Sequence, residues 1–331
     1  MLERSRASIG IHMMLRVRRI VFVVLGLALG AVHASAQDFP SRYIRVIVGP
    51  GLDAPARLFG AKMADVLGQQ VVVEPRPGAG GAIAIQAAAS AAPDGYTLLL
   101  ATAAYTINTA LNQAAHDLRK DFEPVGLVTT VKYVLVLHPS VPVQSLAELI
   151  AYAKAHPGAI NFASPGIGTP PHLAGELFKS MTGANIVHVP FRDANTAINA
   201  VVGGSVQMMF SLAATAQPQI AAGTLRGIGV TSSEPSPFVP GLATLAQLGL
   251  TGFDVLGWNG FVAPRGTPKP VIAKLSAALS EGFDDGELHK RVFASGYEAA
   301  RRNTPEEFGK FIAADTEKWV ALVGKINLKS Q

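Results

Sequence analysis

Two kinds of hydrophobic periodicity alternate along the chain from residue 45 onward. Short β-rich runs at Arg45–Val48, Gln70–Glu74 and Tyr96–Ala101 predict strands. Between them, Pro55–Leu67 has the apolar spacing of an amphipathic helix, and Ala82–Ala91 predicts a helix of small residues. Repeated strand–helix units predict parallel sheets that are covered by helices on both faces.

The pattern changes at Val125–Leu137, where two β-rich runs follow one another without a helix between them. Such a pair predicts a sheet edge or a passage between domains. A second series of alternating strands and helices comes next. Its strands are expected around residues 160–163, 186–189, 206–210 and 225–230, and its helices from Pro171, Thr196 and Thr215.

Capping residues predict where several helices begin. Ser145 followed by Glu148 forms a capping box, in which each side chain satisfies a free backbone N–H of the first turn. The last two helices are expected at 269–283 and 305–323, and the second of these begins with an N-cap threonine, a proline and a capping glutamate. Its apolar stripe predicts core positions, namely Phe308, Phe311, Ile312, Trp319, Leu322 and Val323.

The N-terminus has the three parts of a secretory signal peptide. Five arginines precede an apolar run that covers Ile20–Val32. After this run, Ala34-Ser35-Ala36 offers a small-residue cleavage site. The run is too short to span a bilayer, which needs ~20 residues. We therefore expect a signal peptide at 1–36, cleavage after Ala36 and a periplasmic protein; a buried helix or an uncleaved anchor is the alternative.

Removal of that segment changes the charge and the size of the protein. Loss of five arginines and one glutamate takes the net charge from +5 to +1, which gives no support for binding to nucleic acid or to anionic membranes. The chain has no cysteine, so disulfides, thiol nucleophiles and thiolate metal sites are excluded. The remaining 295 residues exceed the usual size of one domain, and two domains are expected.

Two glycine-rich loops lie between a predicted strand and a predicted helix. Pro77–Gly81 lacks the residues of a nucleotide-binding loop and is interpreted as a tight turn. Ser164–His172 has Thr169 as a potential N-cap, with backbone N–H groups close to a helix N-terminus. Such N–H groups bind anions, so this loop predicts either a ligand site or a plain connection.

The sequence offers no chemistry for catalysis, for a metal or for another cofactor. Its serines lack the setting of a nucleophile elbow, and its histidines are scattered without pairing on one helix or strand face. Its acidic pairs are interpreted as solvated helix ends rather than as an acid and base in one cleft. The residues concerned are Ser211, Ser232 and Ser236, the histidines at 138, 156, 172 and 188, and the pairs 284–285 and 306–307.

A set of short motifs, in order and over essentially the whole mature chain, resembles one family. The motifs are Val71–Gly81, Ala92–Leu99, Lys120–Phe122, His172–Phe178, His188–Phe191, Ala222–Arg226, Ala263–Pro268 and Thr304–Phe308. They resemble the Bug family of periplasmic receptors, the substrate-binding component of tripartite tricarboxylate transporters. The chain is thus interpreted as a receptor and not as an enzyme.

The resemblance implies an α/β fold of the periplasmic-binding-protein-like Venus flytrap type. Two α/β domains, 38–138 with 256–331 and 139–255, would enclose a ligand in the cleft between them and would be joined by two crossing strands. The ligand would be a small organic acid, captured by hinge closure and delivered to membrane permease subunits. A monomer without cofactors is expected. A sensor that presents its closed form to a signalling partner, and an exported two-domain enzyme, are the alternatives.

The resemblance also implies which residues contact the ligand. They are Gly51 and Asp53; Ala103, Tyr105 and Thr106; Ser164, Gly166, Gly168, Thr169 and His172; and Arg192 and Asp193. The chain departs from the family at this site. Its first loop is short and lacks a threonine, Pro170 and Pro171 remove two N–H donors, and Ser211 stands where an aspartate is common. These departures lead to the hypothesis of a ligand that is less charged or differently shaped.

Overall fold

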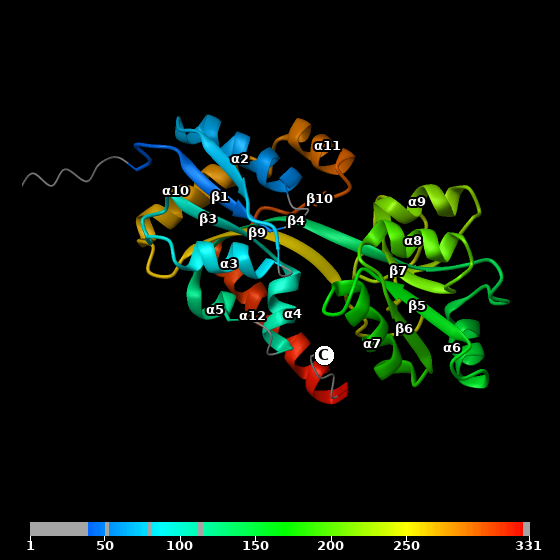
Figure 1. Cartoon of the computed structure of the whole chain (residues 1–331). Coiled ribbons are helices and arrows are strands. Elements are labelled where there is room, and N and C mark those ends of the chain that lie inside the picture. Colours follow the sequence, from blue (N-terminus) through cyan, green and yellow to red (C-terminus); the bar gives the residue numbers. More distant parts are fainter. Residues whose placement is uncertain (1–38, 50–52, 79–80, 112–114, 327–331) are drawn as a thin grey trace, which may run out of the picture. The chain divides into compact units, whose positions relative to one another are not determined.

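The computed structural model describes residues 39–49, 53–78, 81–111 and 115–326 (Figure 1). Contacts between Cα atoms divide the chain into Met1–Ser41 and Arg42–Gln331, and the helices and strands of the described residues belong to the second unit. The predicted signal peptide, residues 1–36, and the predicted site residue Gly51 lie outside the described residues. Among the described helices, none combines the length and the apolar character needed to cross a bilayer.

Strands and helices alternate along most of the unit. The strands are β1 (Ile44–Val48), β2 (Val71–Pro75), β3 (Thr97–Thr102), β4 (Phe122–Leu137), β5 (Ile160–Ser164), β6 (Ile186–Pro190), β7 (Met208–Leu212), β8 (Arg226–Val230), β9 (Leu256–Pro264) and β10 (Glu298–Ala299). The helices are α2 (Asp53–Leu67), α3 (Ala82–Ala89), α4 (Ala103–Ala110), α5 (Leu118–Asp121), α6 (Leu146–Ala155), α7 (Pro170–Thr182), α8 (Ala194–Val202), α9 (Ala213–Ala221), α10 (Lys269–Ser280), α11 (Gly286–Ala294) and α12 (Pro305–Ile326).

The strands form a sheet with the order β2-β1-β3-β9-β4-β7-β5-β6, and β10 and β8 also pair with β4. Residues 122–132 of β4 pair antiparallel with β9, whereas residues 133–137 pair with β7 and β8. We call β2, β1, β3, β9, β10 and the first part of β4 the first half-sheet, and the last part of β4 with β5, β6, β7 and β8 the second half-sheet. The chain passes from one to the other within β4 and again before β9.

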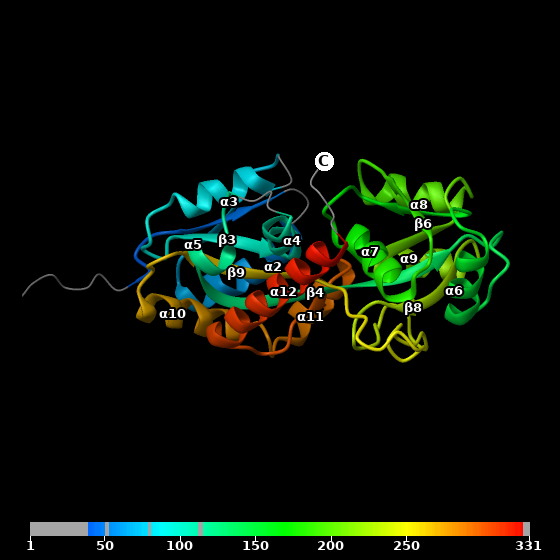
Figure 2. The same cartoon turned by 90° about the horizontal axis from the view of Figure 1, so that it is seen from below.

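Helices cover both faces of each half-sheet, as predicted (Figures 1 and 2). On the first half-sheet, α2, α10 and α11 lie on one face and α3, α4, α5 and α12 on the other. On the second, α6 and α7 pack against one hydrophobic cluster and α8 and α9 against another. Successive residues of β4 enter these two clusters in turn, because side chains alternate between the faces of a strand. Residues Tyr133, Leu135 and Leu137 belong to the first, and Val134 and Val136 to the second.

The prediction for residues 125–137 was wrong in part. These residues belong to one strand of 16 residues in the middle of the sheet, not to two runs at an edge. The register of β4 against β9 shifts at Pro124/Gly126 and at Leu127/Thr129, so the residues that interrupt the pattern are absorbed as irregularities of one strand. The expectation of parallel sheets holds for β1, β2 and β3 and for β5, β6 and β7, but β4 and β9 run antiparallel to their neighbours.

Two predicted caps are confirmed. The backbone N–H of Glu148 donates to Ser145 Oγ at 3.2 Å, and Thr304 and Glu307 cap each other reciprocally. The helical stripe after Thr304 is core as predicted, with Trp319 and Phe308 fully buried. The division into domains 38–138 with 256–331 and 139–255 stays a prediction.

Close packing at Gly260 gives the first testable prediction. A Cβ at this position would lie 2.2 Å from Phe308 Cζ and 2.9 Å from the backbone oxygen of Gly126. Gly260→Ala should therefore lower the free energy of unfolding by ~1–3 kcal/mol in denaturant titrations. The matched control is Gly324→Ala, because a Cβ there meets nothing within 4 Å and the residue is helical. This control should not lower the free energy of unfolding and should raise it by up to ~1 kcal/mol. Equal effects of the two changes would contradict the packing argument.

Candidate functional site

The first predicted loop contributes one described residue, Asp53, which is the first residue of α2. Its carboxylate accepts a hydrogen bond from Arg57 Nη2 at 3.3 Å on the same helix, and 45% of its side chain is exposed. A carboxylate at the start of a helix interacts favourably with the free N–H groups there. The structure thus gives Asp53 local partners within α2.

The second predicted loop, Ser164–His172, connects β5 with α7 and satisfies its own polar groups. Ser164 Oγ accepts from the N–H of Gly166 at 3.1 Å, and Gly168 N–H donates to His172 Nδ1 at 3.2 Å. Thr169 lies at the N-cap position of α7 but makes no side-chain cap; its hydroxyl donates to the backbone oxygen of Gly166 at 2.7 Å. Thr169 thus occupies the predicted N-cap position of α7, but its side chain bonds within the loop and does not cap the helix.

Two histidines from different elements, α7 and β6, contact each other beside this loop, whereas the sequence predicted only that no two histidines share one helix or strand face. The rings of His172, on α7, and His188, on β6, lie 4.2 Å apart between centroids. Ser164 Oγ lies 2.7 Å from His188 Nε2, and Phe162 contacts the same ring. Sequence spacing does not reveal such a pair, because one histidine lies on a helix and the other on a strand, 16 residues further along the chain.

Burial keeps both histidines neutral. Desolvation, with smaller contributions from the nearby His188 and Lys179, lowers the pKa of His172 to about 3. Desolvation also lowers the pKa of His188 to about 4, again with a contribution from Lys179. Lys179 itself is paired with the buried Glu176 at 2.9 Å. At neutral pH the pair can therefore serve as hydrogen-bonding and packing groups but not as cations for a ligand.

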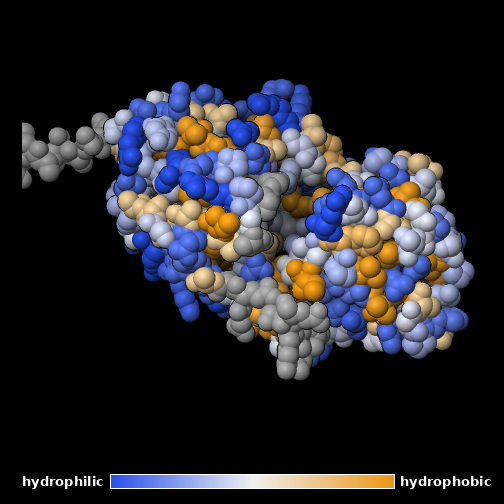
Figure 3. All heavy atoms as spheres, viewed as in Figure 1, coloured by the Kyte–Doolittle hydropathy of each residue, from blue (hydrophilic) through white to orange (hydrophobic). Residues whose placement is uncertain are grey.

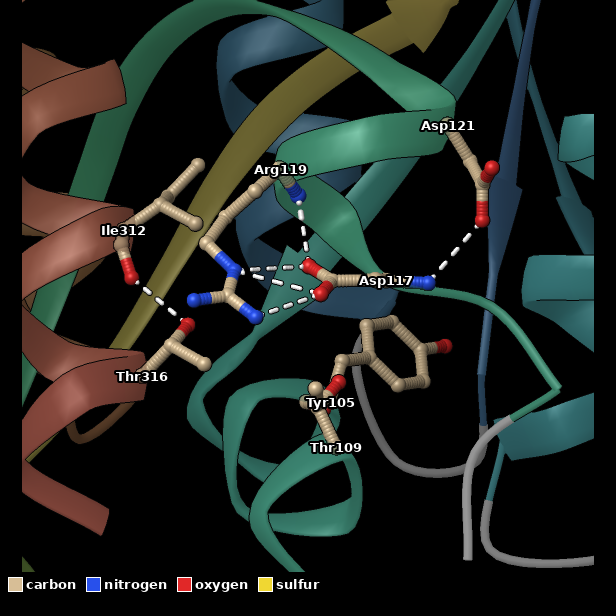
Figure 4. A network of polar contacts seen from close by, with 7 residues as sticks. All are labelled: Tyr105, Thr109, Asp117, Arg119, Asp121, Ile312 and Thr316. Carbon is tan, nitrogen blue, oxygen red and sulfur yellow. Dashed lines mark hydrogen bonds and ion pairs between the residues drawn. The ribbon is translucent and has the colours of Figure 1, made fainter. Parts of the chain in front are cut away.

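The predicted residues after the third strand lie in α4, a helix that the sequence pattern did not predict. Ala103 is at its first turn. The ring of Tyr105 is buried, and its hydroxyl donates to the backbone oxygen of Gly81 at 3.4 Å; burial raises its pKa. Figure 4 shows Tyr105 beside the ion pair between Asp117 and Arg119, with Tyr105 and Thr109 on one helix. Tyr105 therefore packs within the first half-sheet's helical layer.

A buried carboxylate, Asp315 on α12, connects α4 with β9. Its Oδ2 accepts from Trp258 Nε1 at 3.0 Å and lies 2.7 Å from the hydroxyl of Thr106. Lys318 pairs with its other oxygen at 2.9 Å. The predicted site residue Thr106 is fully buried in this network, which holds the Trp258 indole in one orientation.

Arg192 and Asp193 precede α8. Asp193 is the N-cap of that helix and accepts from Thr196 N–H at 2.8 Å, which lowers its pKa together with the Thr196 hydroxyl and Arg192. Arg192 pairs with Asp193 and is 83% exposed. Their bonding is that of a capped helix with a solvated arginine.

A cleft of about 280 Å³ is built from both half-sheets. Figure 3 shows the surface hollowed between their elements. The N-terminal turns of α4, α7 and α9, the middle of β4, the start of β9 and the turn before β10 meet there. Its lining residues are Thr102, Ala103, Ala104, Val131, Tyr133, Pro170, Leu212, Ala214, Thr215, Gly257, Trp258, Asn259, Ser295, Gly296 and Tyr297.

Of the predicted site residues that the structure describes, Ala103 alone is in that lining, and the loop Ser164–His172 reaches it through Pro170. A wider hollow of about 880 Å³ lies over Pro124, α10 and the start of α12, but it involves the first half-sheet alone. Over the described ranges, no group of three histidine, cysteine or acidic side chains is placed to hold a metal. The cleft between the half-sheets is thus the candidate ligand site.

Sequence reasoning missed the aromatic and amide side chains of this cleft. Tyr133, Trp258, Asn259 and Tyr297 come from β4, β9 and the turn before β10, which carry no recognisable motif. One signal was available: Asn259 is a polar residue inside the apolar run Leu256–Pro264. It is buried and donates to Thr129 Oγ1 at 2.8 Å.

The neutral histidine pair predicts the pH dependence of stability. Between pH ~6.5 and ~4 the unfolded chain binds more protons than the folded protein, so the free energy of unfolding should fall as the pH is lowered through this window. The slope is at most about 1.4 kcal/mol per pH unit for each histidine.

His172→Asn retains an acceptor for the Gly168 N–H and should flatten the slope, as measured by denaturant titrations at several pH values. His156→Asn, at an exposed residue, should keep the original slope. Identical slopes for His172→Asn and the unmodified protein would contradict this account.

The chain is similar to known proteins over most of its length. The family described as Tripartite tricarboxylate transporter family receptor matches residues 56–328. Protein BugT of Bordetella pertussis is 32% identical over 96% of this chain and 99% of its own length.

Two solved structures are similar in fold and sequence. The periplasmic binding protein BugD has a TM-score of 0.72 and 31% identity over 88% of this chain and 100% of its own. MatC of Rhodopseudomonas palustris with bound malate has a TM-score of 0.72 and 33% identity over 86% of this chain and 100% of its own. The fold is therefore an α/β fold of the periplasmic-binding-protein type, and the chain belongs to the Bug family of tripartite tricarboxylate transporter receptors, which are solute-binding proteins and not enzymes.

Proposed function

We propose that this protein captures a small organic acid in the periplasm by hinge closure and delivers it to the membrane permease subunits of a tripartite tricarboxylate-type transporter. The observation that carries the proposal is the cleft to which both half-sheets contribute. A ligand there touches α4 and β9 on one side and α7 and α9 on the other. It therefore stabilises whichever arrangement brings these elements together.

The helices that meet at the cleft favour an acid. The N-terminal turns of α4 and α9 expose backbone N–H groups and carry partial positive charge. These groups bind carboxylates without a cationic side chain. The malate bound by the similar protein MatC supports the same ligand class for this chain.

Hinge closure requires flexible connections at the far end of the cleft. The half-sheets are joined within β4 and again just before β9, where Val255 N–H bonds to the backbone oxygen of Thr231. A polar contact crosses the same place: Lys132 Nζ, which pairs with Glu298 at 2.9 Å within the first half-sheet, donates to the backbone oxygen of Pro235 at 2.7 Å. The proposed bodies are 38–138 with 256–331, and 139–255, and they would rotate about this line.

Closure also involves the contact of α7 with α4 and α12. A Cβ at Gly168 would lie 3.2 Å from Leu111 Cδ1 and 3.5 Å from Asn108 Oδ1, so the loop before α7 is close to the end of α4. Opening would separate these surfaces. An exported monomer, directed by the arginine-rich N-terminal segment, completes the proposal.

A bulky side chain in the cleft should weaken ligand binding. Ala214→Trp places an indole at the cleft end of α9, and it should weaken the affinity for any bound organic acid at least about tenfold, as measured by isothermal titration calorimetry. The matched control, Ala221→Trp, lies at the exposed opposite end of the same helix and should bind normally. If both variants bind as the unmodified protein does, the ligand site lies elsewhere.

Ligand capture should also make the protein more compact. Small-angle X-ray scattering with and without a bound acid should show a smaller radius of gyration in the complex, because closure brings the two bodies together. Ala214→Trp under the same conditions should show no ligand-dependent change. Binding without compaction would leave capture in place and would exclude hinge closure.

A further inference from the structure

One side of α12 holds Trp258, a residue of the cleft lining, by three side chains. Phe308, Phe311 and Asp315 are spaced so that they share one side of the helix. The ring centroids of Phe308 and Phe311 each lie 5.6 Å from that of Trp258, in edge-to-face contact. Asp315 Oδ2 accepts a hydrogen bond from the indole Nε1 at 3.0 Å. Because Trp258 lines the cleft, α12 determines where this wall stands.

The hydrogen bond is the directional part of this packing. Edge-to-face aromatic contacts are compatible with several orientations of an indole, whereas an N–H donor points at one acceptor. Trp258 is 1% exposed, so its N–H has no ready access to bulk water. A buried donor that loses its acceptor must turn toward another partner or remain unpaired at a cost. The Asp315 carboxylate therefore selects one orientation of the indole.

The same carboxylate oxygen reaches the first turn of α4. Thr106 Oγ1 lies 2.7 Å from Asp315 Oδ2 and 2.8 Å from the backbone oxygen of Ala103, which lines the cleft. A hydroxyl carries one hydrogen, so Thr106 donates to these two acceptors in turn. Asp315 Oδ1 pairs with Lys318 at 2.9 Å, which restrains rotation of the carboxylate. Two walls of the cleft, from β9 and α4, thus depend on one buried acceptor.

We propose that Asp315 is a positioning residue for ligand capture, because it holds the Trp258 indole and the first turn of α4 in the arrangement that binds a small organic acid. Asp315 is 5% exposed, and the described lining of the cleft includes Trp258 and Ala103 but not Asp315. It therefore acts through its partners. The inference rests on the proposed function and adds a residue of α12 to the site. When fewer molecules have the binding arrangement, the apparent affinity falls by the same factor.

Calorimetric titration with malate, succinate, adipate and citrate measures the effect on affinity, and the variants are compared with the acid that the unmodified protein binds most tightly. Asp315→Leu is similar in size but removes the acceptor, and it should weaken binding at least about tenfold, since hydrogen bonds to charged groups are the stronger ones. Asp315→Asn keeps an oxygen for the indole N–H and should bind within about threefold of the unmodified protein. The ion pair with Lys318 that it loses is partly exposed and contributes little.

The matched control is Thr316→Val, at the next residue of α12. Thr316 is 1% exposed, and its hydroxyl donates to the backbone oxygen of Ile312 on the same helix at 2.7 Å (Figure 4). This variant loses a buried hydrogen bond that does not reach the cleft, so it should bind the same acid normally. If Asp315→Leu binds as tightly as Thr316→Val, or Asp315→Asn as weakly as Asp315→Leu, the inference is overturned and the proposed function stands. If none of the four acids binds the unmodified protein, both are overturned.

Nuclear magnetic resonance tests the contact without any ligand. The protein has two tryptophans, Trp258 and Trp319, so protein labelled with heavy nitrogen gives two indole N–H signals, which Trp319→Phe assigns. Asp315→Leu should move the Trp258 proton signal upfield and speed its hydrogen exchange, because the bond that deshields and protects this proton is lost. Thr316→Val should leave the signal in place. An unchanged Trp258 signal in Asp315→Leu would show that the bond is not made and would overturn the inference.

A double-mutant cycle with Trp258→Phe shows whether Asp315 acts through the indole. Phenylalanine keeps an aromatic wall but has no N–H, so in this background Asp315→Leu leaves no indole donor unpaired and should weaken binding about threefold or less. A loss as large as about tenfold in this background would overturn the inference. The double variant gives this result even where Asp315→Leu alone does not fold, since its reference is Trp258→Phe.

Discussion

One strand, β4, supports both the fold and the candidate site. It supplies backbone hydrogen bonds to β9 along its first eleven residues and to β7 and β8 along its last five. Its side chains are buried on both faces at the second half-sheet, so each residue there belongs to one of two cores. The change of partner falls between Lys132 and Tyr133, and Val131 and Tyr133 line the cleft at that point. Residues that line the candidate site therefore lie next to the line along which the half-sheets are joined.

Much of the fold follows from local pattern, and the exceptions have physical causes. The strands β1, β3 and β5 and the caps of α6 and α12 were predictable because their signals lie within a few residues. In contrast, β9 contains Gly257 and Gly260, and glycine weakens a strand pattern. Because these residues have no side chain, Tyr133 can pack against the backbone of Gly257 and Phe308 against that of Gly260. Tertiary packing thus requires glycines at positions where local propensity predicts an interruption of the strand. The same holds for the bulged start of β4.

The candidate site was predictable only in part. Reasoning from motifs identified loops that follow strands, and Ala103 and the neighbourhood of Pro170 do line the cleft. Several of the polar side chains so identified are bonded within their own segments: Ser164 with Gly166, Thr169 with Gly166, and Asp193 with Thr196. Motifs of this kind report the geometry of a turn. They do not show which groups are left for a ligand, since this depends on partners that are distant in sequence.

The groups left for a ligand are those that the fold places without partners of their own. The N-terminus of α9, which no side chain caps, and the Tyr133 phenol of β4 come together because β7 and β4 pair, so that Leu212 is opposite Tyr133. That register places the first turn of α9 beside Tyr133 in the lining of the cleft. Asp315 then fixes Trp258 on the facing wall through a buried hydrogen bond. The arrangement of the cleft walls thus depends on pairing register and on one buried carboxylate, neither of which appears as a motif in the chain.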